Sequence, residues 1–139
     1  MIIIKHSIKT SATPEAVWKL WSAVENWPQW DHGIEAAALE GPFEKGTKGW
    51  LKPIGGPKVK FEILSAQKNV GFHDRSFLPL TRLDFKHSIT QVNGETVVTH
   101  EVEMKGLFSF IFSRVVGSNI KKDMPSAMQK LIDLAETKK

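Results

Sequence analysis

The stretch that decides the fold is Arg82-Leu-Asp-Phe-Lys-His-Ser-Ile-Thr-Gln-Val-Asn-Gly-Glu-Thr-Val-Val-Thr-His-Glu-Val-Glu-Met104. Two runs of alternating apolar and polar residues flank Asn93-Gly94, a dipeptide that favours a two-residue turn between antiparallel strands. Counting outward from this turn places His87 opposite His100. The stretch therefore predicts a β-hairpin in which two histidines are cross-strand neighbours.

One face of this hairpin is apolar apart from the two histidines. Side chains on one face of a strand recur at every second residue. The opposite face is polar or charged from Arg82 to Glu103, and we expect it to face water. Besides the histidines, the apolar face carries Leu83, Phe85, Ile89, Val98, Val102 and Met104.

The composition is that of an ordinary globular protein. With 139 residues, 41% of them hydrophobic and 24% charged, we expect a single domain over residues 1–139 with a core of its own. The absence of cysteine excludes disulfides and thiol chemistry. The sequence contains no glycine-rich phosphate or dinucleotide motif and no dense set of metal ligands, so we predict neither a cofactor nor a metal.

The net charge of +4 raises the question of a nucleic-acid partner. The lysines are scattered, and most alternate with apolar residues as solvated positions on strands do, so we expect no nucleic-acid binding. No apolar run approaches the length of about 18 residues that a membrane span needs, and we expect no stable membrane insertion. The N-terminus does not read as a signal peptide, which makes the cytoplasm the expected location.

The residues before the hairpin predict one strand, two short helices and four more strands. Alternation from Ile2 to Ile8 predicts a strand whose buried face includes His6. Thr13-Pro14-Glu15 has the cap, proline and acidic residue typical of a helix start, and 26–31 allows a further helical turn. The later strands are expected at Ile34–Leu39, Thr47–Pro53, Pro57–Leu64 and Lys68–Phe77. In the last of these, Val70 and Phe72 would share the buried face with Asp74 and Ser76.

Residues 107–136 have helical spacing, with a bend or break expected near 113–118 because of Gly117 and Pro125. The apolar stripe of this helix is Ile120, Met124, Ala127 or Met128, Leu131 and Leu134. Its first residues, Leu107–Phe112, are apolar nearly all round. They are most simply a buried first turn, and the alternative is a mobile lip at the mouth of a pocket.

Three motifs carry a resemblance to a known family. They are Thr13-Pro-Glu-Ala-Val-Trp18, Trp27-Pro-Gln-Trp30 and Gly94-Glu-Thr-Val-Val-Thr-His-Glu-Val102. Together with the order of elements, over essentially the whole chain, they make the sequence resemble the START-like SRPBCC superfamily, and most of all its polyketide cyclase/dehydrase-like group. The resemblance implies an α+β helix-grip fold, in which a curved seven-stranded antiparallel sheet wraps around a long C-terminal helix and encloses an apolar cavity.

The pair His87 and His100 is the main candidate for function. It falls on a non-hydrogen-bonded position of the hairpin, where Cα atoms approach to about 4.5 Å. Two imidazoles this close resist being charged together, so we expect at least one to be neutral at physiological pH. Four interpretations remain open: a structural role, recognition of a ligand, acid–base catalysis, and a metal site that would need His6 or Asp74 as third ligand.

The function favoured by these observations is binding of a hydrophobic small molecule, lipid-like or polyketide-like, between sheet and helix. The alternative is a cyclase or isomerase, with His87, His100 and Asp74 as catalytic candidates. A third possibility is a protein-interaction module that uses Phe108, Phe110 and Phe112. Both a monomer and a homodimer fit the sequence. The expected ligand-binding residues are His87, His100, His6, Phe61, Phe72, Phe85, Val102, Met104, Met124, Met128 and Trp30.

Overall fold

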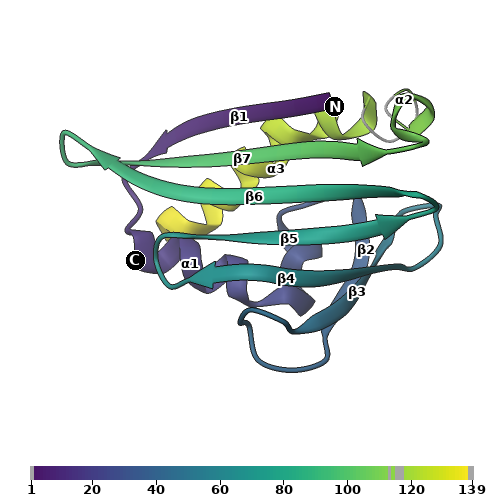
Figure 1. The fold of residues 1–139 in the computed structure, drawn as a ribbon. Coiled ribbons are helices and arrows are strands. Elements are labelled where there is room, and N and C mark those ends of the chain that lie inside the picture. The colour runs from purple at the N-terminus through teal and green to yellow at the C-terminus, as the bar shows by residue number, and fades with distance from the viewer. Residues whose placement is uncertain (1, 113, 115–117, 138–139) are drawn as a thin grey trace.

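The computed structural model describes residues 2–112, 114 and 118–137, which form the predicted α+β fold (Figure 1). Within these residues, seven antiparallel strands make one curved sheet in the order β1-β7-β6-β5-β4-β3-β2. Strands β2 to β7 follow one another as neighbours, and β1 is added beside β7. The strands are β1 (Ile2–Thr10), β2 (Ile34–Leu39), β3 (Lys48–Pro53), β4 (Val59–Gln67), β5 (Gly71–Leu78), β6 (Thr81–Val92) and β7 (Glu95–Gly106).

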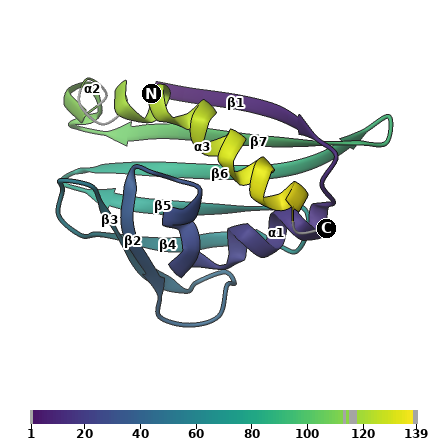
Figure 2. The ribbon, with the colours of Figure 1, turned by 180° about the vertical axis from the view of Figure 1, so that it is seen from behind.

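The helices lie on one side of the sheet, and α3 crosses its concave face (Figure 2). The predicted start of α1 is confirmed, because the Oγ1 of Thr13 accepts from the N–H of Ala16 at 3.2 Å. None of the described helices is long and apolar enough to cross a membrane. The helices with both ends described are α1 (Pro14–Ser22), the 3-10 helix η1 (Val24–Gln29), α2 (Ser109–Phe112) and α3 (Ser118–Thr137).

The register predicted for the central hairpin is confirmed at every pair. His87 lies opposite His100, and Phe85 lies opposite Val102. Asn93 and Gly94 have positive φ angles of 53° and 81°, the backbone conformation that a tight turn of this kind requires. Because β5 and β1 pair with the two strands of this hairpin, its register determines which residues of both neighbours face inward.

The core lies between the concave face and the helices. On α3 the predicted stripe is largely confirmed, since Met124, Met128 and Leu131 are buried, while Ile120 and Leu134 are half-buried. The end of α3 is tied to the sheet by Thr10, whose hydroxyl donates to Glu136 at 2.7 Å. The largest fully buried side chains include Trp21, Phe61, Ile63, Met104, Met128, Leu131 and Ile132.

Two predicted strand limits are wrong. The strand expected from Lys68 begins only at Gly71, because Asn69 adopts a positive φ of 64° and turns the chain. Val70, which was expected on the buried face, therefore lies in this turn with 46% of its surface exposed. The preceding strand extends beyond its predicted end to Gln67, through a register shift after Ile63.

The segment Leu107–Phe112 is not the buried first turn that was the simplest interpretation. Leu107 and Phe110 are 67% and 66% exposed. Within the region 107–136, which was predicted to be helical, the structure describes α2, which ends at Phe112, and α3, which begins at Ser118. The bend or break expected near 113–118 falls on residues 113 and 115–117, which lie outside the described part of the chain.

We expected the outer face of the sheet to be exposed to water. It is charged, but two of its acidic side chains are buried. Asp84 is only 2% exposed, because Arg75 covers it and donates to its two carboxylate oxygens at 2.7 and 3.0 Å. Glu103 is 6% exposed between Lys86 at 3.3 Å and Lys105 at 3.0 Å. Long cationic side chains lie over the shorter acidic ones and remove them from water.

We predict that Gly49→Ala destabilises the fold, whereas Gly56→Ala does not. A Cβ at Gly49 would collide with the carbonyl oxygen of Ala38 and with the ring of Phe61. The overpacking should lower the free energy of unfolding in urea by about 1–3 kcal/mol. Gly56 is the matched control, because a Cβ there meets nothing closer than the ring of Pro53 at 3.6 Å. Equal stability of the two variants would contradict the close approach of β2 and β3.

Candidate functional site

Three histidines lie side by side across the concave face, one on each of three neighbouring strands. His6 of β1 pairs with His100 of β7, which pairs in turn with His87 of β6. The rings of His87 and His100 meet edge to face, with centroids 4.6 Å apart and an interplanar angle of 73°. The predicted contact between these two imidazoles is confirmed, and His6 extends the row.

His100 is buried and hydrogen-bonded. It is 7% exposed, and the indole N–H of Trp21 donates to its Nε2 at 3.2 Å. Burial, followed by the charge of His6, lowers the pKa of His100 to about 3. The ring is therefore neutral at physiological pH, and Nε2 serves as a hydrogen-bond acceptor.

His87 lies between aromatic rings and a carboxyl group. It stacks on Phe72 with ring centroids 3.9 Å apart and 6° between the planes, and the ring of Trp21 packs edge-on at 5.5 Å. Its Nδ1 is 3.8 Å from Oδ1 of Asp74, which is beyond hydrogen-bond distance. Burial, and then the charge of His100, lower the pKa of His87 well below its usual range.

Asp74 faces the concave side beside these rings, as the alternation in β5 predicts. It is 2% exposed and lies between Ile63 and Phe85 in the register of the sheet. Burial raises the pKa of Asp74 well above its usual range, and the charge of Asp84 adds to the shift. A protonated carboxyl group and a neutral imidazole therefore face each other, and each can donate or accept one proton.

Four buried polar atoms on the inner side of the sheet have no hydrogen-bond partner among the described residues. They are Trp30 Nε1, Asp74 Oδ1, Ser76 Oγ and His87 Nδ1. Most buried polar atoms in folded proteins are paired, so a group of four on one side of the sheet is unusual. Trp30 belongs to the same region as the histidines, because its ring packs against that of His100 at 5.9 Å.

Apolar side chains near these atoms are incompletely covered. Phe85 points to the concave face between Asp74 and Val102, yet it is only half-buried. A densely packed interior would leave little surface accessible on inward-facing side chains. Accessible apolar surface therefore accompanies the unpartnered polar atoms.

The structure brings the expected site residues to one side of the sheet. His87 contacts Phe72 and His100 directly. His6 and Phe85 are half-buried, while Phe61, Phe72, Val102, Met104, Met124, Met128 and Trp30 are buried. No group of three or more histidine or acidic residues in the described ranges is placed to hold a metal ion.

Two members of the site were not selected from the sequence. Ser76 could have been chosen, because it shares the alternation that placed Asp74 on the inner face. The hydrogen bond from Trp21 to His100 has no local signal, since it joins residues 79 positions apart in the chain. Only the packing of α1 against the sheet brings them together.

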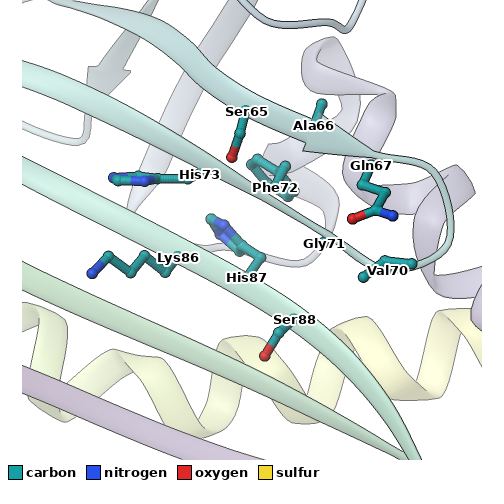
Figure 3. A pocket seen from close by; sticks show the side chains of 10 residues that line it. All are labelled: Ser65, Ala66, Gln67, Val70, Gly71, Phe72, His73, Lys86, His87 and Ser88. Carbon is teal, nitrogen blue, oxygen red and sulfur yellow. The ribbon is translucent and has the colours of Figure 1, made fainter.

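An open hollow of about 540 Å³ is lined mainly by outer-face residues of β4, β5 and β6, and Phe72 and His87 of the candidate site also contribute to its lining (Figure 3). His73 and Lys86 line it on neighbouring strands. Lys86 is paired with Glu103 at 3.3 Å. Nε2 of His73 is 3.5 Å from Asp84 but has no hydrogen-bond partner among the described residues. The hollow therefore offers little unbalanced charge. Its lining residues are Ser65, Ala66, Gln67, Val70, Gly71, Phe72, His73, Lys86, His87 and Ser88.

We predict that acidification destabilises the fold through His100. The pKa of His100 is about 3 in the folded chain and about 6.5 in an unfolded one, so only the unfolded state gains its proton as pH falls between these values. Burial raises the pKa of Asp74 and lowers that of His87, so the contributions of these two groups to the pH dependence have opposite signs and offset each other.

Urea unfolding of variants between about pH 5 and pH 6 checks these assignments. Asp74→Asn should steepen the loss of stability on acidification, because it removes a group whose pKa is raised by folding. His100→Phe should reduce the loss by about 1 kcal/mol per pH unit. Ser88→Ala, at an exposed residue that does not titrate, is the control and should leave the slope unchanged. If Asp74→Asn had the wild-type slope, Asp74 would be ionised in the folded chain.

Solved structures show the same arrangement of sheet and helix. TTHA0849 from Thermus thermophilus superposes with a TM-score of 0.75 at 14% identity, over 98% of both chains. Ara h 8.0201 gives 0.76 at 13% identity, also over 98% of both. StfQ, a di-domain ARO/CYC protein from the steffimycin biosynthetic pathway, gives 0.77 at 9% identity, over 99% of this chain and 51% of StfQ. At these identities the likeness shows the fold alone.

The sequence itself is matched at the level of the family. No curated protein matches the chain. The family model described as polyketide cyclase / dehydrase and lipid transport matches residues 1–136, which is nearly the whole length. This agrees with the resemblance carried by the three sequence motifs. The chain belongs to the polyketide cyclase / dehydrase and lipid transport family.

Proposed function

We propose that this protein binds a hydrophobic small molecule, lipid-like or polyketide-like, between the concave face of the sheet and α3. The observation that carries the proposal is the buried pair Asp74 and His87, whose facing atoms have no hydrogen-bond partner and lie near half-buried apolar side chains. The family description, which names polyketide cyclases and lipid transport, supports the same class of ligand.

The unpartnered atoms provide a physical reason for a ligand. A buried polar atom without a partner costs about 1–3 kcal/mol, and a bound molecule that hydrogen-bonds to it removes this cost. Each methylene that leaves water contributes about 0.8 kcal/mol more. In this proposal His87, His100, His6 and Asp74 form the polar end of the site. The apolar wall is Phe61, Phe72, Phe85, Val102, Met104, Met124, Met128 and Trp30.

The charges around the site favour a neutral ligand. None of the described residues that face inward from β4 to β7 is a lysine or an arginine. A ligand carboxylate beside Asp74 would lose its hydration, and no lysine or arginine that faces inward from these strands would compensate for the loss. A protonated Asp74 donates a hydrogen bond, and a carbonyl or hydroxyl oxygen accepts it without bringing charge. The polar group of the ligand is therefore proposed to be a ketone, ester or alcohol.

A second function, a cyclase or isomerase, is favoured by the same pair. His87 Nδ1 and Asp74 Oδ1 are 3.8 Å apart, and both groups are neutral. A neutral imidazole can remove a proton from the carbon beside a carbonyl, while the protonated carboxyl group gives its proton to the carbonyl oxygen. The product is an enol, with the imidazole protonated and the carboxylate ionised. His100 would assist by holding His87 in position.

We predict that a long-chain methyl ketone binds at least about tenfold more tightly than the fatty acid of the same chain length at neutral pH, because only the acid brings a charge to the site. Tryptophan fluorescence can follow both titrations, since Trp21 and Trp30 pack against His100. Asp74→Leu should weaken ketone binding about three- to tenfold through the lost hydrogen bond. Ser88→Ala, at an exposed position on the same strand as His87, is the matched control.

The outcomes of this titration distinguish a failure of the proposed function from a failure of the preference for a neutral ligand. If neither compound binds, and a broader set of apolar compounds also fails, the proposed function is wrong. If the acid binds as tightly as the ketone, ligand binding stands but the preference for a neutral group is wrong. If Asp74→Leu binds the ketone as the wild type does, the polar end of the site lies elsewhere.

The enzymatic alternative has a direct test in the exchange of protons beside the carbonyl of a bound ketone. In deuterated water, NMR would show deuterium entering at this carbon if His87 removes the proton. We expect an enzyme to lose this exchange by about 100-fold or more in His87→Gln while it keeps ketone binding. A carrier would show no exchange above background in the wild type, which would leave binding as the only function.

A further inference from the structure

One end of the molecule exposes a cluster of large apolar side chains. We call the cluster the apolar tip, and it consists of Leu80, Leu107, Phe110 and Ile111. These side chains are 68%, 67%, 66% and 48% exposed. Single exposed apolar residues are normal on a protein surface, but a cluster of this kind marks a contact surface.

Backbone hydrogen bonds hold the parts of the apolar tip together. The N–H of Leu107 donates to the carbonyl of Leu80 at 2.9 Å, which joins the turn after β5 to the end of β7. The N–H of Phe108 donates to the hydroxyl of Thr81 at 3.2 Å. Phe110 and Ile111 follow directly in α2, at the end of the sheet where α3 also begins (Figure 1). Segments far apart in sequence thus form one surface.

Cationic side chains lie around the apolar tip. Arg82 and Lys105 lie directly opposite each other on β6 and β7, and Arg114 is exposed just after α2. The segments 77–82 and 105–114, which supply the tip, contain no acidic residue. Lys105 is already paired with Glu103 at 3.0 Å, so Arg82 and Arg114 are the cations that an anionic partner would meet.

We propose that the apolar tip docks on the surface of a bilayer containing anionic phospholipids. Apolar side chains with cationic neighbours fit a membrane interface, where the former enter the boundary of the acyl chains and the latter meet the lipid phosphates. Phe77, which is 49% exposed and pairs with Arg82, continues the same surface along the outer face.

The shape of the apolar tip favours a bilayer over a folded partner. Its side chains come from a turn, the end of a strand and a four-residue helix, and 48–68% of each residue's surface is exposed. A stable protein interface buries about 800 Å² on each partner with matched shapes. A bilayer needs no matching shape and accepts projecting side chains individually. The tip therefore fits a lipid surface, with the chain held at the membrane and not through it.

The position of the apolar tip connects it to the concave face. Leu78 and Ile120 lie at the same end of the molecule, one at the end of β5 and the other in the first turn of α3, and both pack only partly buried against the core. An apolar compound could pass from an adjoining bilayer to the interior along these side chains. The docking itself does not depend on the proposed function.

Co-sedimentation with lipid vesicles tests the docking. We expect binding to vesicles in which about a third of the phosphatidylcholine is replaced by phosphatidylglycerol, and at least fivefold less binding to phosphatidylcholine alone. Raising NaCl from about 0.1 M to about 0.5 M should weaken the binding, because salt screens the cations. The double variant Phe110→Ser/Ile111→Ser and the double variant Arg82→Gln/Arg114→Gln should each reduce binding at least fivefold.

Matched controls change the same residue types at the opposite end of the hairpins. Val92→Ser, at the 53% exposed last residue of β6, and Lys68→Gln, in the β4–β5 turn, should bind vesicles as the wild type does. Circular dichroism of each variant verifies the fold. Failure of the wild type to bind anionic vesicles, or equal loss in the control variants, would overturn the proposal. The proposal would also be overturned if the wild type were a dimer and the double variant Phe110→Ser/Ile111→Ser were a monomer, because a second copy of the chain would then cover the tip.

Discussion

The two-residue turn at Asn93-Gly94 holds β6 and β7 in one register, and the rest of the sheet is built outward from this pair. β5 pairs with β6 and β1 pairs with β7, so their inward residues follow from the same alignment. A slip of one residue would move the apolar face to the solvent and the charged face to the core. The positive φ angles at the turn thus determine that His6, His87 and His100 form one row.

Buried carboxyl groups on the two faces of the sheet have pKa shifts in opposite directions. Asp84, on the outer face, is as buried as Asp74. Arg75 donates two hydrogen bonds to Asp84, and together with the nearby positive charges they outweigh the effect of burial, so the pKa of Asp84 is lowered. Asp74 has no cationic partner in the described structure, and burial raises its pKa. A buried charge persists only where an opposite charge compensates for lost hydration. The outer carboxylate therefore holds the strands together, whereas the inner one is suited to meet a ligand.

Most of the fold could be read from local patterns. The hairpin, the start of α1, the inward direction of Asp74 and the apolar stripe of α3 all follow from turn chemistry or from the period of the side chains. The errors arose where the pattern was short or the solvent contact was decided by distant segments. Only Val70 and Phe72 were available to decide which face of the strand predicted over Lys68–Phe77 is buried, and Val70 lies in a loop. Leu107 was expected to be buried from apolar composition alone, but it is exposed.

The sequence by itself determined which residues share a face, because the alternation of a strand and the geometry of a two-residue turn are local properties. Only the tertiary structure decided which of these residues lose their water and which partners they find. Trp21 reaches His100 through the packing of α1, and Arg75 covers Asp84 from the neighbouring strand. Oδ1 of Asp74 is left without a hydrogen-bond partner among the described residues. The physical reason is that desolvation and hydrogen bonding depend on groups from distant parts of the chain, and they set the protonation of the site.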